Sequence, residues 1–231
     1  MPQMPDFPKL SGPYLGQKWP GMIPELFAPG IVSLENSSEY GITFSPDGKE
    51  IYFGRRSRIV CVRQEEGRWM PPSEWAISSG HGAMEPHVTL DNRRIYWNWE
   101  KPTSEDRLVW IYVSTRGTAG WMGSVYAGSG MYVSSSRDGS IYLTVLGEQG
   151  PLSEATVENG RFIRVKPLKT IQQLGARPGI SPDGDYIIFD NGNGDLRVSF
   201  RKRPDDWSDP IQLSKFGLPS DAFAGSISPD G

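Results

Sequence analysis

The chain repeats a polar turn followed by consecutive apolar residues. The first copy is Ser45-Pro46-Asp47-Gly48-Lys49-Glu50-Ile51-Tyr52-Phe53, and similar runs follow Asp91, Asp138 and Asp183. The turn alone returns at Asp230. The aspartates are separated by 44, 47, 45 and 47 residues (91−47, 138−91, 183−138 and 230−183). Self-similarity at such a period predicts a repeat architecture.

Each repeat contains short runs of β-branched and aromatic residues between turn residues, which predicts strands joined by hairpins. No segment has a convincing helical period. In the first repeat the expected strands are Gly41–Ser45, Glu50–Gly54, Arg58–Arg63 and Arg68–Met70. Later third strands are expected at Leu108–Val113, Leu152–Val157 and Asp195–Phe200, and later fourth strands open with Trp121, Phe162 and Trp207.

Four short strands per repeat are typical of a β-propeller blade, whose sheet packs both faces against neighbouring blades. We therefore predict an all-β fold: a β-propeller of five repeats, each a four-stranded antiparallel blade. The last blade is expected to be incomplete at the C-terminus, with Ala224–Ser228 as its innermost strand and an N-terminal strand, Pro24–Phe27, closing it. Residues 1–23 are expected to form an extended arm and 24–231 a single domain.

The runs Phe44–Phe53 and Ile180–Phe189 share the pattern Phe/Ile-Ser-Pro-Asp-Gly-x-x-Ile-Tyr/Ile-Phe. This pattern resembles the TolB-type, WD-like propeller repeat of bacterial proteins, over roughly residues 24–231. Tyr14–Gly21 and Pro24–Ser33 also look like parts of exported bacterial propellers. The resemblance implies a periplasmic or exported protein, although Met1–Pro8 contains no signal peptide. Nothing resembles the additional N-terminal domain of TolB itself.

Composition narrows the classes of partner. The formal net charge of −3 gives no basic field for nucleic acid, and no window reaches the length of an apolar membrane span. The only cysteine, Cys61, excludes an internal disulfide and lies in a predicted strand, where we expect a buried packing role. We expect neither nucleic-acid binding nor membrane insertion.

Counting back from each aspartate identifies equivalent positions in the first strands. Six residues before it lie Gly41, Glu85, Tyr132, Arg177 and Ala224, and four before it lie Thr43, His87, Ser134, Gly179 and Ser226. Because side chains alternate along a strand, both sets are expected to face the central channel. The candidate ligand-binding residues at the channel mouth are Glu85, His87, Tyr132 and Arg177, with Glu39 and Tyr40 beside them.

Two interpretations of these residues stay open. In the first, Arg177 binds a carboxylate, Glu85 and His87 bind hydroxyls, and Tyr132 stacks on a sugar. In the second, Glu85 and Arg177 form a salt bridge that plugs the channel. The sequence supports both.

Metal and catalytic motifs are weak. His81, Glu85 and His87 could ligate a metal, but their spacing fits no standard site. Asp190–Asp195 lacks the alternating acidic residues of a calcium loop and is expected to be a hairpin. The repeated aspartates are expected to be turn residues. We expect no metal, cofactor or catalytic residue.

The predicted function is a non-catalytic propeller that binds a small polar or anionic ligand, a glycan or a protein at the channel mouth. The alternative is a carbohydrate-active hydrolase or lyase, which needs two carboxylates across the mouth or a metal with several ligands. Glu85 lies on the rings, and Glu39 lies on the adjoining loop. A third possibility is an interaction scaffold that contacts a partner through Trp97 and Trp99.

Overall fold

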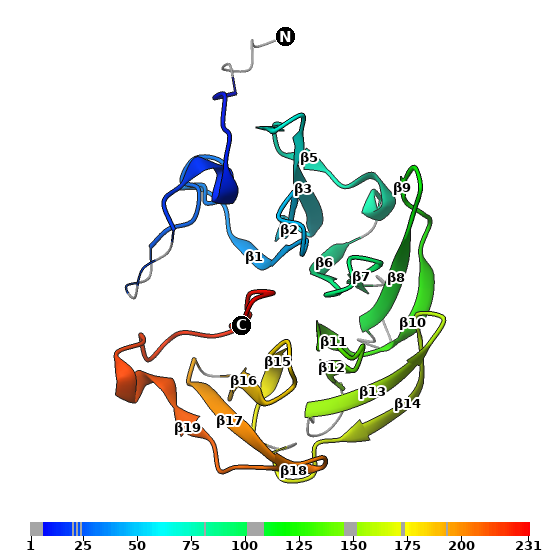
Figure 1. Ribbon diagram of the computed structural model, residues 1–231, viewed down its shortest axis with the longest axis vertical. Helices are drawn as coiled ribbons and strands as arrows, with labels where there is room; N and C mark the ends of the chain where they lie inside the picture. The colour runs from blue at the N-terminus through cyan, green and yellow to red at the C-terminus, as the bar shows by residue number, and fades with distance from the viewer. Residues whose placement is uncertain are drawn as a thin grey trace.

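The computed structural model describes residues 7–19, 21, 23, 25–80, 82–100, 109–145, 152–171, 174–192 and 194–231. Four antiparallel sheets are arranged as the blades of a propeller, with β1, β6, β11 and β15 nearest the centre (Figure 1). The prediction of an all-β propeller is confirmed, and the described residues form four blades. No described helix is long and apolar enough to span a membrane.

Blade 1 contains β1 (Glu39–Phe44), β2 (Glu50–Arg55), β3 (Arg58–Glu65), β4 (Arg68–Trp69) and β5 (Ser73–Glu74). Blade 2 contains β6 (Ala83–Val88), β7 (Arg94–Glu100), β8 (Val109–Gly117), β9 (Gly120–Trp121) and β10 (Val125–Ser129). Blade 3 contains β11 (Met131–Ser135), β12 (Ile141–Thr144), β13 (Leu152–Glu158) and β14 (Arg161–Pro167). Blade 4 contains β15 (Ala176–Ile180), β16 (Tyr186–Asp190), β17 (Leu196–Arg203), β18 (Asp206–Trp207) and β19 (Ile211–Gln212). Short 3-10 helices are η1 (Pro13–Gly16), η2 (Ala76–Ser78) and η3 (Leu213–Phe216).

The outermost strand is split in three blades, where β4 and β5, β9 and β10, and β18 and β19 each pair with a single third strand. Pro71-Pro72 separates the first pair and Pro210 precedes β19. Proline has no N–H to donate to the ladder, so it interrupts an edge strand at little cost. The predicted short fourth strands are therefore only the first parts of these edges.

The joints between blades explain the consecutive apolar residues of the second strands. Tyr52, Tyr96 and Tyr142 are each 1% exposed and pack in the core shared with the following blade. Ile95 and Trp97, which flank Tyr96 in the sequence, pack in the core that blade 2 shares with the preceding blade 1. Complete burial of each such side chain contributes about 1.5–3 kcal/mol.

The Asp-Gly turns are structural, as predicted. Asp47 Oδ1 accepts bonds from Ser45 Oγ at 2.6 Å and from the Lys49 amide at 3.2 Å. Asp91 and Asp138 accept the equivalent bonds in blades 2 and 3.

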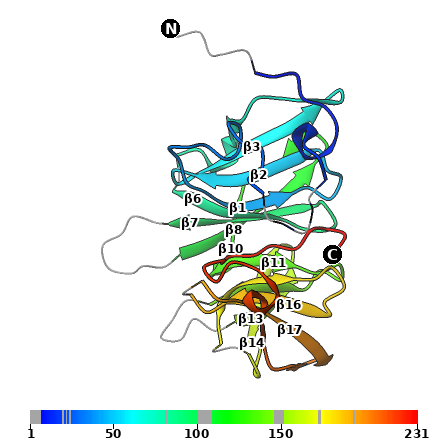
Figure 2. The ribbon, with the colours of Figure 1, turned by 90° about the vertical axis from the view of Figure 1, so that its left-hand side faces the viewer.

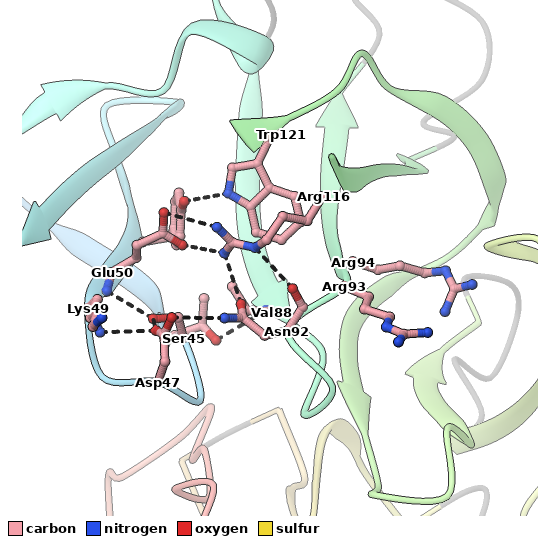
Figure 3. Close-up of polar contacts among 12 residues, drawn as sticks. Ser45, Asp47, Lys49, Glu50, Val88, Asn92, Arg93, Arg94, Arg116 and Trp121 are labelled. Atoms are coloured by element: carbon pink, nitrogen blue, oxygen red, sulfur yellow. Dashed lines mark hydrogen bonds and ion pairs between the residues drawn. The ribbon is translucent and has the colours of Figure 1, made fainter. Parts of the chain in front are cut away.

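The turn of blade 1 also holds the joint with blade 2 (Figure 3). Asn92 Nδ2 donates to Asp47 Oδ2 at 3.1 Å, and Arg116 bonds both Glu50 and Asn92. The Arg116 guanidinium also lies 4.0 Å over the Trp121 ring. The turn aspartate of blade 1 thus also binds the turn of blade 2.

The N-terminal segment covers blade 1. Trp69 Nε1 donates to the Gly12 carbonyl at 2.8 Å, and Leu15, Ala28 and Val32 are buried in the same core cluster. The predicted closing strand Pro24–Phe27 is not confirmed. Glu25–Phe27 belong to no strand, and Pro24 lies outside the described residues. Phe27 packs on blade 1 instead because apolar side chains there supply its burial.

The fifth blade is not confirmed either. Ala224–Ser228 form no strand and run between blade 4 and blade 1 (Figures 1 and 2). The last turn is nevertheless formed, because the Gly231 amide donates to the Ser228 carbonyl at 3.0 Å, as Gly48 does to Ser45 at 2.8 Å. The fifth copy therefore has the turn of a repeat without its sheet.

Candidate functional site

A β-bulge interrupts the first strand of every blade. Pairing with the second strand shifts between Tyr40 and Thr43, Met84 and His87, Met131 and Ser134, and Ala176 and Gly179. The residue six before each aspartate has a positive φ: 58° at Gly41, 51° at Glu85, 57° at Tyr132 and 55° at Arg177. A left-handed residue other than glycine costs about 1–2 kcal/mol. Bulges re-aim side chains, and Glu85, Tyr132 and Arg177 occupy the same bulge position of successive blades.

The bulges also change the predicted alternation. Thr43 Oγ1 accepts a bond from the Val88 amide at 3.3 Å, and Ser134 Oγ accepts one from the Ile180 amide at 2.9 Å. Both hydroxyls, four residues before an aspartate, therefore bond across joints between blades. The extra residue in each strand was not visible to simple alternation.

Glu85 leans over blade 1. A Cβ atom at Gly41 would lie 2.6 Å from Glu85 Oε2, so this close approach favours glycine there. The Glu85 carboxylate makes no hydrogen bond or ion pair with the described residues. Burial raises the pKa of Glu85 to about 7, although the positive charge of Arg177 acts in the opposite direction. Near neutral pH this carboxyl can therefore donate or accept a hydrogen bond.

Arg177 is paired with a carboxylate that sequence reasoning missed. Its Nη1 donates to Asp190 Oδ1 at 2.6 Å, and Asp190 is fully buried. The guanidinium lies 5.2 Å over the Tyr132 ring and 5.5 Å over the Phe223 ring. The described residues contain no Glu85–Arg177 salt bridge of the kind predicted to plug the channel.

Asp190 belongs to a recurring feature of the second strands. Each of blades 2, 3 and 4 has a buried polar residue at or near the C-terminal end of its second strand: Asn98, Thr144 or Asp190. Thr144 Oγ1 accepts a bond from the Arg177 amide at 3.0 Å, and Asp190 Oδ2 accepts one from the Ala224 amide at 3.0 Å. A polar residue directly after a buried apolar run was the sequence clue to these supports.

His87 lies partly buried at a joint. Its Nε2 is 2.8 Å from Ser135 Oγ of blade 3, and burial lowers its pKa to about 4, so the imidazole is neutral near pH 7. His81 lies outside the described residues. Within the described part of the chain, no group of three or more His, Cys, Asp or Glu residues could hold a metal ion.

Glu39 and Tyr40 support blade 1. Glu39 Oε1 accepts a bond from Arg55 Nε at 2.7 Å, and Arg55 also binds the Ile31 carbonyl at 2.9 Å. The Tyr40 hydroxyl accepts a bond from the Ser57 amide at 3.2 Å. These contacts attach the segment before β1 to the sheet.

The scaffold hypothesis required Trp97 to contact a partner. Trp97 is only 2% exposed, in the joint between blades 1 and 2, and cannot do so. Cys61 is buried as predicted, and burial raises the pKa of its thiol to about 12.

A groove of about 420 Å³ lies elsewhere, between the turns of blades 3 and 4. Asp138, Tyr142, Asp183 and Arg201 are among its lining residues. None of the predicted site residues lines it.

The fold and its repeated ring positions define a β-propeller protein. No protein-family model and no curated protein matches the chain. A structure provisionally assigned as TolB from Agrobacterium tumefaciens is similar at 16% identity with a TM-score of 0.54, over 73% of this chain and 59% of that one. The chain thus spans about three fifths of that relative.

Two further solved structures resemble the fold. A puromycin-hydrolysing peptidase of Mycobacterium tuberculosis matches 87% of this chain and 34% of its own at 14% identity and a TM-score of 0.52. A protein provisionally assigned as a gluconolactonase matches 78% of this chain and 65% of its own at 10% identity and a TM-score of 0.50. At these identities the likeness extends to the propeller fold alone.

Proposed function

We propose that this protein is a non-catalytic binding propeller with TolB-type repeats, whose channel mouth takes a small glycan or other hydroxyl-rich ligand. The observation that carries the proposal is the shared bulge position of Glu85, Tyr132 and Arg177, where three bulky side chains accept a left-handed backbone. Residues with a strained backbone at one repeated position of a rigid scaffold are a reason to propose function.

The chemistry of the three side chains favours hydroxyls over a strong anion. Asp190 neutralises much of the charge of Arg177, so the expected attraction to an anionic ligand is weaker than the sequence alone predicted. The Glu85 carboxylate makes no hydrogen bond or ion pair with the described residues, and it can donate a hydrogen bond to a hydroxyl or accept one near neutral pH. Arg177 lies over one face of the Tyr132 ring, and a sugar ring would stack on the other face.

The hydrolase alternative is less well supported. Glu85 has a pKa suited to a general acid, but a glycosidase of the common type uses two carboxyl groups. The carboxylate brought to Arg177 is Asp190, which is fully buried and ion-paired and is therefore poorly placed to act as a nucleophile or base.

His87, Glu39 and Tyr40 position the ring rather than contact the ligand. Ala224, with a φ of 50°, supplies a fifth ring position and begins a fifth blade. The protein acts in the periplasm or outside the cell.

An array of neutral and uronic-acid oligosaccharides tests this function. We expect saturable binding to at least one glycan, weakened at least tenfold by Glu85→Gln. Glu158→Gln, at the exposed end of β13, is the matched control and leaves binding unchanged. If no glycan binds, or if both variants bind like the parent protein, the proposal is wrong.

A further inference from the structure

The same pair of side chains occurs at two joints of the propeller. The Arg116 guanidinium lies 4.0 Å from the centre of the Trp121 ring, and that of Arg201 lies 4.5 Å from the centre of the Trp207 ring. Each arginine is directly opposite its tryptophan on the neighbouring strand. Each Nε donates to the carbonyl of the residue after the turn aspartate of its own blade, at 3.0 Å and 2.6 Å. The joints between blades 1 and 2 and between blades 3 and 4 therefore contain corresponding arginines.

In the joint between blades 1 and 2, two side chains from the turns complete this arrangement (Figure 3). The Glu50 carboxylate accepts bonds from both Nη atoms of Arg116, and Asn92 Oδ1 accepts one from Nη2 at 2.9 Å. Asn92 Nδ2 donates to Asp47 Oδ2 at 3.1 Å. This joint therefore supplies a carboxylate to the arginine and an N–H donor to the turn aspartate.

Small residues stand at both positions in the joint between blades 3 and 4. Ser140 corresponds to Glu50, because each lies two residues before the buried tyrosine of its second strand. Gly184 corresponds to Asn92, because each directly follows a turn aspartate. The groove of about 420 Å³ lies at this joint, lined by Ser140, Gly184 and Arg201 among others. It therefore occupies the space that the Glu50 and Asn92 side chains fill at the other joint.

The contacts of Arg201 differ accordingly, because it has no carboxylate partner in the described part of the chain. Its Nη1 donates to a backbone carbonyl at 2.9 Å, and its Nη2 donates to the Tyr142 hydroxyl. At the other joint, the Tyr52 hydroxyl accepts a bond from Trp121 Nε1 at 2.6 Å. The corresponding Trp207 Nε1 is buried and has no hydrogen-bond partner among the described residues. A buried donor without an acceptor is rare enough in native proteins to need an explanation.

The groove carries charges of both signs. Arg201, Lys202 and Arg203 line it, as do Asp138 and Asp185, which form no ion pair with the described residues. The other acidic lining residues are paired with cations outside the groove. A ligand with both a carboxylate and an ammonium group fits this distribution better than a simple anion does.

We propose that this groove binds a free α-amino acid. Its carboxylate binds the two Nη atoms of Arg201, in the bidentate geometry that makes arginine–carboxylate pairs strong and specific. Its ammonium group donates to Asp138, as Asn92 donates to Asp47 at the other joint. Once Arg201 bonds the ligand, the Tyr142 hydroxyl can accept the bond of Trp207 Nε1. None of the bulged ring residues lines the groove, so this inference does not rest on the glycan site.

Isothermal titration of the full chain with each of the twenty L-amino acids tests the site. We expect saturable binding of at least one of them. The C-terminal amide of that amino acid lacks the carboxylate, and its N-acetyl derivative lacks the ammonium group, so each should bind at least tenfold more weakly. Absence of binding by all twenty would overturn the proposal, as would undiminished binding of either derivative.

A double variant that copies the other joint, Ser140→Glu with Gly184→Asn, should abolish binding by filling the groove. Asparagine accepts a left-handed backbone, as Asn92 does with a φ of 57°, and a Cβ atom at Gly184 would lie 3.7 Å from its nearest neighbour, Arg201 Nη2. The melting temperature should therefore be at least that of the parent protein. Ser73→Glu, on the exposed edge strand β5, is the matched control and leaves binding unchanged. Binding retained by the double variant would contradict the site.

The indole N–H signal of Trp207 gives an independent readout. Nitrogen-15 spectra, with the signal assigned by Trp207→Phe, should show it moving downfield when the amino acid binds, because the Tyr142 hydroxyl then accepts its hydrogen bond. A saturated complex in which this signal is unchanged would overturn the placement of the carboxylate on Arg201.

Discussion

The ion pair between Arg177 and Asp190 gives a sharp test of how the ring is held. Replacing Arg177 with Met leaves the fully buried Asp190 carboxylate without its cation. Removing one partner of a buried pair costs about 3–5 kcal/mol. Asp190 keeps amide bonds from Gly192 at 2.8 Å and Ala224 at 3.0 Å, and the Arg177 side chain is 24% exposed. We therefore expect a smaller loss of unfolding free energy, about 2–3 kcal/mol.

Urea denaturation of the protein measures this loss. With an m-value of about 2–3 kcal/mol per M, the midpoint should fall by about 1 M. Asp190→Asn removes the unpaired charge but keeps an acceptor for only one of the two amides, which bond different carboxylate oxygens, so the double variant should regain part of the loss. A loss below about 0.5 kcal/mol, or strictly additive effects in the cycle, would refute the reasoning.

Three further predictions follow from the same contacts. Because the folded-state pKa of Glu85 is raised, its ionisation destabilises the fold as pH rises from about 4.5 to about 7. The free energy of unfolding of Glu85→Gln should therefore come to exceed that of the parent protein by about 1–2 kcal/mol as the pH rises across this range. Urea titrations at several pH values measure this difference, and equal pH profiles of the two proteins would contradict a raised pKa of Glu85. Asp47→Ala should lower the free energy of unfolding by about 1–2 kcal/mol, because it removes the turn bonds and the bond from Asn92. Asp183→Ala, which removes an exposed ion pair with Arg137, should lower it by less than about 0.5 kcal/mol. Thermal unfolding compares the two variants, and similar losses would contradict the stabilising role of Asp47 at the joint between blades 1 and 2. Cys61 should react with a thiol reagent only after unfolding, since it is 8% exposed and its pKa is raised to about 12, and rapid native-state reaction would contradict its burial.

The repeated turn made the propeller fold predictable. Each copy of the turn, Asp91-Asn92 in blade 2 and Asp-Gly in the others, marks the end of an innermost strand, and the period of the copies places the four described blades. The strands were found to within a few residues because their apolar runs face two joints at once.

The details of the ring were less accessible to sequence. A bulge adds one residue without changing the apolar pattern, so alternation assigned Thr43 and Ser134 to the channel although their hydroxyls bond across joints. Counting from the aspartates still identified Glu85, Tyr132 and Arg177 as equivalent. The pairing of Arg177 with Asp190 depends on a contact between strands that no local spacing encodes.

Near the N-terminus, similarity to the later repeats did not predict the structure. Pro24–Phe27 resembles the segment before each later repeat, yet Phe27 and Ala28 pack on blade 1. Phe27 and Ala28 lie there because the apolar side chains of blade 1 bury them. Local similarity alone predicted a closing strand.

We infer that a ligand contacts the bulged ring at the channel mouth. Amide chemical-shift mapping during titration with a glycan that binds on the array tests it most directly. The account predicts the largest shifts at Gly41, Glu85, Tyr132 and Arg177. Shifts concentrated at Asp138 and Arg201, in the groove between blades 3 and 4, would contradict it.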